Sequence, residues 1–70
     1  MAVHRVTEIT ASSKKGLEAA VEEGLRRAAL TLKGIVSLEV ASIKARVLKG
    51  KIAEYRVTLK VGYVPDDGSP

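Results

Sequence analysis

Side chains that could carry out covalent chemistry are few in this chain of 70 residues. It contains no cysteine, which excludes a thiol nucleophile, disulfides and thiolate zinc sites. The single histidine, His4, has no acidic partner within sequence reach, and we interpret it as a surface residue. Glu39 and Glu54 could meet across a hairpin, but a carboxylate pair without a pocket is weak support for acid–base catalysis. With no glycine-rich phosphate loop either, we predict that the protein is not an enzyme.

The basic side chains offer a different chemistry, the binding of anions. Twelve Lys and Arg against eight Asp and Glu give a net charge of +4, which favours contact with anions without specifying which. Lys44, Arg46, Lys49 and Lys51 gather around one predicted turn. This cluster is either a solvated turn or a polyanion contact. No aromatic residue lies among these cations to stack on bases, which favours the solvated turn, and we expect no nucleic-acid partner.

The elements that position these side chains follow from hydrophobic periodicity. Val3–Thr10 alternates β-branched and charged residues and predicts a strand, and Ser13 is suited to cap the helix that follows. From Lys14 to about Lys33 the period is helical, and Gly34 is suited to end the helix. The apolar stripe of this helix is formed by Leu17, Val21, Leu25, Ala28 and Leu32.

Two further patterns belong to the same helix. Residues four apart form a ridge of small side chains that predicts close packing, namely Ala20, Gly24 and Ala28. Two acid–base pairs at the favourable spacing of four are expected on its surface, namely Glu22 with Arg26 and Glu23 with Arg27.

The rest of the chain predicts a β-hairpin. Ile35–Val47 is one strand, Lys49-Gly50 supplies the turn, and Ile52–Val64 is the other strand. The last strand alternates cleanly, with Tyr55, Val57, Leu59, Val61 and Tyr63 on one face and Glu54, Arg56, Thr58 and Lys60 on the other. We therefore expect one domain over residues 1–65, ended by Pro65, and a polar, disordered tail over residues 66–70.

Size and geometry together predict an oligomer. A chain of this length buries only about 60% of its unfolded surface, and neither disulfides nor an obvious metal site compensate. One helix is too short to cover so long a sheet. We expect the strand ends, and a second sheet face with Ile43, Ala45 and Val47, to require at least a trimer. No signal peptide and no apolar run of about 20 residues is present, so we expect a cytoplasmic protein without a membrane partner.

In order and spacing, the sequence resembles the dodecin family. The matching stretches are Val6 to Ile9 with Ser12-Ser13, the Ala- and Arg-rich helix from Gly16 to Leu32, Glu39-Val40 with Ser42-Ile43, and Tyr55 to Tyr63, which reads YRVTLKVGY. The correspondence runs without gaps from about Val3 to Tyr63. It implies an α+β protein of βαββ topology, with one helix packed across a three-stranded antiparallel sheet, assembled into a hollow homododecamer. It also implies a storage protein that binds flavins and is not a catalyst.

The chain departs from the family pattern where the flavin would bind. The family's stacking tryptophan falls at Ser37, its flavin-contacting glutamine falls at Arg56, and an arginine that can serve phosphate falls at Val64. Glu39 and Lys44 complete the set of candidate cofactor-binding residues. An aromatic wall contributes about 1–3 kcal/mol per stacked ring, which a serine cannot replace. We therefore expect binding of flavin mononucleotide (FMN) or riboflavin to be weak or absent, with FMN preferred because Arg56 can pair with its phosphate.

The meaning of these substitutions stays open. Ser37 and Arg56 could mark a site remodelled for another anion or a nucleotide. In the other interpretation, Arg56 pairs with Glu39 or Glu54 of the same or a neighbouring subunit, which is favoured because most charged strand residues are solvated or paired. The protein is accordingly either a small-molecule binding and storage protein or a structural, partner-binding shell that no longer binds flavin.

Overall fold

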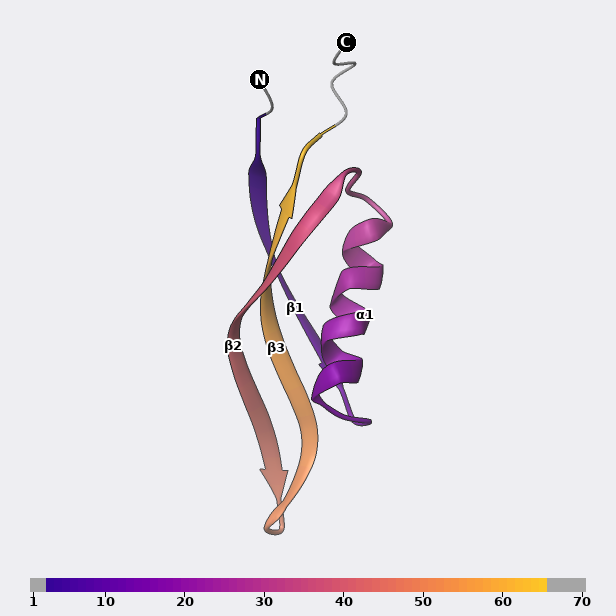
Figure 1. The fold of residues 1–70 in the computed structure, drawn as a ribbon. Helices are drawn as coiled ribbons and strands as arrows, with labels where there is room; N and C mark the ends of the chain where they lie inside the picture. Colours follow the sequence, from indigo (N-terminus) through magenta and orange to yellow (C-terminus); the bar gives the residue numbers. More distant parts are fainter. Residues whose placement is uncertain (1–2, 66–70) are drawn as a thin grey trace.

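The computed structural model describes residues 3–65 as a βαββ fold (Figure 1). The elements follow in the order β1 (Arg5–Ser13), α1 (Leu17–Ala29), β2 (Ile35–Leu48) and β3 (Lys51–Tyr63). The predicted polar tail, residues 66–70, lies outside the described residues. The predicted α+β architecture, with a helix on a three-stranded antiparallel sheet, is confirmed.

The last strand of the chain is the central strand of the sheet. The strand order is β1-β3-β2, and β3 pairs antiparallel with both neighbours. Residues directly opposite each other in an antiparallel pair point to the same face, so the register assigns each paired side chain to a face. Helix α1 packs against one face, here called the helix-side face (Figure 1). The opposite face, which no element of residues 3–65 covers, is called the open face.

The hydrophobic core lies between α1 and the helix-side face. Val57, Leu59 and Val61 are fully buried, because alternation along β3 directs all three toward the helix. Three small residues complete the core, namely Ala11 of β1 and Ala20 and Ala28 of α1. The alternation predicted for β3 is thereby confirmed.

The helix presents a different face to the sheet from the one that its large apolar residues predict. Its buried residues are Ala20, Gly24 and Ala28. By contrast, Leu17 and Leu25 of the predicted stripe are 36% and 37% exposed. A Cβ atom at Gly24 would lie 2.5 Å from Cδ1 of Leu59, so the small-residue ridge brings the helix backbone down onto the central strand. The expected close packing of the ridge is confirmed, whereas Leu25 of the predicted apolar stripe lies beside the buried face and not within it.

The helix also begins later than predicted. Strand β1 continues through Ser13, which pairs with Tyr55. The Ser13 hydroxyl accepts a hydrogen bond from the backbone N–H of Lys15 at 3.0 Å, and the residue at the helix N-cap is Gly16, which has no side chain to offer. Ser13 is therefore not the helix cap, because β-pairing holds it in the sheet.

The helix ends at Ala29 rather than near Lys33. Gly34 does not end it directly but turns the chain into β2 with a φ of 74°, a backbone conformation that glycine adopts without steric cost. The carbonyl of Gly34 accepts a hydrogen bond from the N–H of Val64 at 2.9 Å. This bond ties the start of β2 to the residue that follows β3.

The hairpin closes with the predicted Lys49-Gly50 turn. Both residues have positive φ, 52° and 75°, the combination that defines a type I′ turn. Because pairing with β1 ends at Tyr55, the segment Arg46–Glu54 forms a two-stranded arm that extends beyond β1 and α1 (Figure 1).

Apolar side chains of the hairpin are left uncovered. Ile43 lies opposite Val57 and Ala45 opposite Tyr55, so both belong to the helix-side face and not to the second face expected from the sequence. Ile43 is nevertheless 55% exposed, because α1 packs mainly over β1 and β3. The arm adds three more exposed large apolar residues, Val47, Leu48 and Ile52. Among residues 3–65, no helix is long and apolar enough to cross a membrane.

Candidate functional site

The four candidate cofactor-binding residues from the sequence lie on the open face, in cross-strand rows that run from β2 across β3 to β1. In order along the sheet the rows are Ser37, Gly62 and Val6; Glu39, Lys60 and Glu8; Ser42, Thr58 and Thr10; and Lys44, Arg56 and Ser12. In the third row the hydroxyls of Thr10 and Thr58 are 3.4 Å apart. Most of the open face is therefore polar, with a row of hydroxyls between two charged rows.

The row that contains Arg56 is cationic. Arg56 lies directly opposite Lys44 on one side and Ser12 on the other, and all three are exposed. Two like charges directly opposite each other in a sheet are destabilising. No ion pair in the described part of the chain reaches Arg56 or Lys44, so this row is open to an anion.

The two acids proposed to pair with Arg56 have other neighbours. Glu54 forms an ion pair with Arg46 at 3.5 Å, since the two lie opposite each other across the hairpin. Glu39 lies opposite Lys60. Arg56 therefore forms no ion pair with Glu39 or Glu54 of its own chain, and its pairing with an acid of a neighbouring subunit stays a prediction.

Ser37 lies against Gly62 of the central strand. A Cβ atom at Gly62, directly opposite on β3, would overlap Oγ of Ser37 and would lie 3.6 Å from its Cβ. The serine side chain therefore leans across the central strand and covers Gly62, which is buried. A larger side chain at position 37 would follow the same direction and extend further over the open face.

Ser37 and Arg56 are not brought together within one chain. Ser37 lies opposite Gly62, whereas Arg56 lies six residues before Gly62 on the same strand. At about 3.3 Å per residue, roughly 20 Å separate the two positions. This separation follows from the register, which the sequence pattern alone does not reveal.

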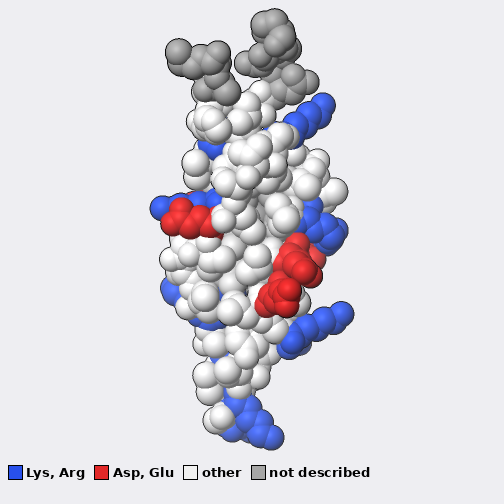
Figure 2. All heavy atoms as spheres, in the orientation of Figure 1, with Lys and Arg blue, Asp and Glu red and all other residues white. Residues whose placement is uncertain are grey.

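The two aromatic residues contribute nothing to the open face. Tyr55 and Tyr63 share the helix-side face with Val57, Leu59 and Val61, as predicted, and both are partly buried. The basic cluster around the turn includes exposed Lys49 and Lys51, and Figure 2 shows Lys and Arg side chains at the tip of the arm. Among residues 3–65, no group of three or more acidic or histidine side chains could hold a metal ion.

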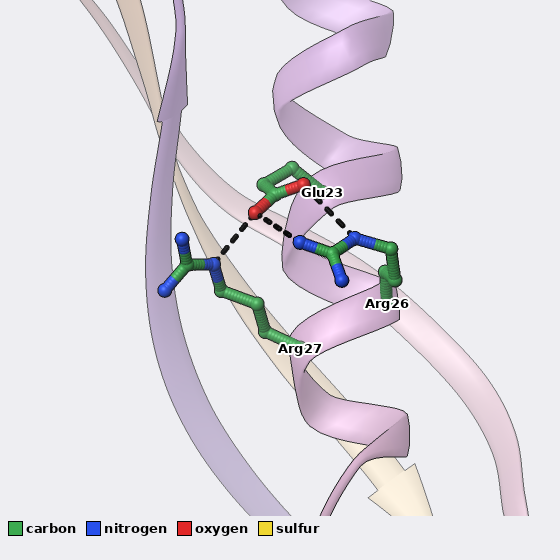
Figure 3. Close-up of polar contacts among 3 residues, drawn as sticks. All are labelled: Glu23, Arg26 and Arg27. Carbon is green, nitrogen blue, oxygen red and sulfur yellow. Dashed lines mark hydrogen bonds and ion pairs between the residues drawn. The ribbon is translucent and has the colours of Figure 1, made fainter.

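The strongest polar cluster lies elsewhere, on the exposed side of α1 (Figure 3). The carboxylate of Glu23 accepts hydrogen bonds from Arg26 at 2.8 and 3.2 Å and from Arg27 at 2.6 Å. These bonds, first to Arg26 and then to Arg27, lower the pKa of Glu23 from 4.5 to about 2. The expected Glu23–Arg27 pair is confirmed, whereas Arg26 pairs with Glu23 instead of with Glu22.

A polar groove of about 580 Å³ runs beside this cluster, between α1 and β1. It is lined partly by Glu22, Glu23, Arg26 and Arg27 and contains none of Ser37, Glu39, Lys44 and Arg56. The groove and the candidate site are therefore separate features of the molecule.

The fold and the open face define a class of small βαββ proteins. Comparison with known proteins identifies the family. The family model described as Dodecin matches residues 3–66. Over 61 residues, the chain is 36% identical to the dodecin of Thermus thermophilus, covering 87% of this chain and 88% of that protein. The chain belongs to the dodecin family, whose members are small flavin-binding proteins that are not enzymes.

Solved structures agree. The dodecin from Streptomyces davaonensis matches with a TM-score of 0.88 and 35% identity, covering 94% of this chain and 97% of that one. The dodecin from Streptomyces coelicolor matches with a TM-score of 0.88 and 30% identity, covering 94% of both chains. A Thermus thermophilus dodecin variant with a tryptophan changed to phenylalanine matches with a TM-score of 0.90 and 33% identity, covering 96% of this chain and all of that one.

Proposed function

We propose that the protein is a cytoplasmic, non-catalytic homododecamer whose open faces bind a flavin weakly, with FMN preferred over uncharged riboflavin. The observation that carries this proposal is the cationic row of Lys44 and Arg56, which no carboxylate of residues 3–65 neutralises. A phosphate group relieves the repulsion between these side chains by accepting charge-assisted hydrogen bonds from both. Riboflavin has no phosphate and gains nothing from this row.

The site is shared between copies of the chain. Because Ser37 and Arg56 lie roughly 20 Å apart along one sheet, a ligand that touches both rows of one chain must be unusually long. A second copy related by a two-fold axis places its own cationic row beside Ser37 of the first, and the first returns the same contact. Glu39, two residues after Ser37 on the same face, then accepts hydrogen bonds from the polar edge of the ring system.

Binding is weak because the ring system meets no aromatic wall. Ser37 takes the place that the family gives to tryptophan, and both tyrosines of the chain belong to the helix-side face. At about 1–3 kcal/mol for each stacked ring, two missing walls cost roughly 2–6 kcal/mol, and each 1.4 kcal/mol is tenfold in affinity.

Native mass spectrometry followed by calorimetric titration tests the proposal. We expect a dodecamer of the 7.4 kDa chain, with FMN binding measurably tighter than riboflavin and losing that advantage as salt rises. Lys44→Gln with Arg56→Gln should abolish the preference for FMN, whereas Lys51→Gln, which changes an exposed lysine of the turn, should leave it unchanged. A monomer at micromolar concentration, or nanomolar binding of riboflavin by the unmodified chain, contradicts the proposal.

The converse experiment restores the family pattern. Ser37→Trp together with Arg56→Gln should give tight riboflavin binding with quenched flavin fluorescence. If this variant assembles normally and still ignores flavins, the alternative function applies, in which the protein is a structural or partner-binding shell. The absence of any aromatic side chain on the open face of residues 3–65 is the observation that favours that alternative.

A further inference from the structure

We infer that Gly62 is a positioning residue that leaves room for the side chain at position 37 to lie across the central strand and so sets how a ligand ring can lie on the open face. The identity of the ligand rests on the proposed function. The contact between positions 37 and 62 does not, because both residues belong to one chain. Glycine at this point of β3 leaves an area of bare backbone that the opposite side chain covers.

The geometry around Gly62 supports this role. Gly62 is buried although it belongs to the open face, since Ser37 leans over it. A Cβ atom there would overlap Oγ of Ser37. With a residue other than glycine at position 62, the Ser37 hydroxyl must therefore rotate away from β3.

A β-bulge aims residue 37 at this position. Ile35 lies opposite Tyr63 and Ser37 lies opposite Gly62, so Val36 is an extra residue without a partner on β3. A bulge of this kind bends the strand and redirects the next side chain. The bulge and the glycine act together, because one turns residue 37 toward β3 and the other leaves room for it.

Stability measurements on four proteins test the contact without any ligand. Gly62→Ala should be less favourable in the chain that has Ser37 than in a Ser37→Ala background, because only in the first must a hydroxyl rotate away from the added atom. The reason is that Cβ of residue 37 lies 3.6 Å from the added atom, an ordinary van der Waals distance, whereas Oγ does not. Equal effects in the two backgrounds contradict the inference, because they leave no coupling between the positions.

A tryptophan at position 37 reports on the same contact and on binding. The chain has no tryptophan of its own, so Ser37→Trp introduces a unique fluorophore. We expect an indole with restricted motion and low access to acrylamide. Adding Gly62→Ala should release the indole, raise its quenching by acrylamide and weaken FMN binding by at least about tenfold. Thr58→Ala, a change two rows away on the same face, serves as the control and should leave the indole in place.

The outcomes separate this inference from the proposed function. If the indole is held by Gly62 and released by alanine while FMN never binds, the positioning role stands and the flavin function fails. If FMN binds to the Ser37→Trp variant and Gly62→Ala changes neither quenching nor affinity by more than about twofold, the positioning role is overturned.

Discussion

Gly24 of α1 lies so close to Leu59 of β3 that a Cβ atom on the glycine would approach Cδ1 of the leucine to 2.5 Å. Cβ of Ala11 lies at 3.3 Å from the same point, so the added atom has no direction of escape toward β1. This one contact sets how near the helix approaches the sheet, because Leu59 is fully buried and has little freedom to move.

We therefore expect Gly24→Ala to destabilise the protein, although alanine is the better helix former by about 1 kcal/mol. Overpacking a core costs about 1–3 kcal/mol, which equals or exceeds that gain. Denaturant unfolding measures the difference. Leu59→Val, which removes the δ carbons, should rescue the Gly24→Ala variant, whereas simple stabilisation by Gly24→Ala alone contradicts the packing described here.

The loss of stability on truncating Leu59, Leu25 and Leu30 to alanine should follow the order of their burial. Leu59→Ala should cost about 2–5 kcal/mol, because it leaves a cavity under the helix. Leu30→Ala is the matched control, since its side chain is 73% exposed and its loss should change stability by less than about 0.5 kcal/mol. Leu25 is 37% exposed, so we expect Leu25→Ala to cost about 1 kcal/mol. A cost for Leu25→Ala equal to that of Leu59→Ala would show that another subunit covers Leu25.

The Glu23 cluster predicts a pH dependence with a definite sign. Arg26 and Arg27 lower the pKa of Glu23 from 4.5 to about 2, so folding favours the charged carboxylate. The resulting stabilisation is present above pH 4.5 and is lost as the pH falls toward 2. It should be modest and weakened by salt, because both arginine side chains are mostly exposed.

Thermal melts between about pH 6 and about pH 2 check this dependence in the Glu23→Gln variant, with Glu22→Gln as the control. The Glu23→Gln variant should lose the part of the acid sensitivity that the cluster causes. Glu22, an exposed neighbour without an ion pair in residues 3–65, should give a curve like that of the unmodified protein. Identical curves for both variants would contradict a stabilising role for the cluster.

The turn of the hairpin offers a pair of opposite changes. Gly50→Ala should cost about 1 kcal/mol, because its φ of 75° is unfavourable for a residue with a side chain. Lys49→Asn should be neutral or stabilising, since asparagine accepts the positive φ of 52° that lysine now adopts. Comparing the two melting temperatures checks the type I′ assignment, and equal effects of the two substitutions would contradict it.

The sequence predicts the parts of the fold in which local pattern and tertiary packing agree. Alternation along β3 directs Val57, Leu59 and Val61 to the core, and the Lys49-Gly50 turn fixes the hairpin. The helix face is harder to predict, because hydrophobic periodicity weighs large side chains and overlooks close approach. Here the small ridge around Gly24 decides the packing, and Leu25 moves to the flank.

For the candidate site, the sequence provides the residues but not their arrangement. Ser37 and Arg56 are found only through the family resemblance, since neither belongs to a chemical motif. The strand register shows that both residues lie on the open face. It also places them at different ends of that face. The register depends on extra residues such as Val36, which leave no mark in the alternation of a strand that is exposed on both faces.

Those extra residues also determine the shape of the sheet as a surface. Val36 and Ala41 are unmatched on β2, and Ala53 is unmatched on β3, so the β2–β3 pair is interrupted at three places while the β1–β3 pair is regular. Each bulge increases the local right-handed twist. The sheet is therefore twisted between the Ser37 end and the Lys44 end of the open face, so a partner with a flat surface cannot contact both ends. In the proposed dodecamer, a surface turned in this way would meet two neighbouring subunits at an angle, which is the geometry that a curved, closed wall of identical subunits requires.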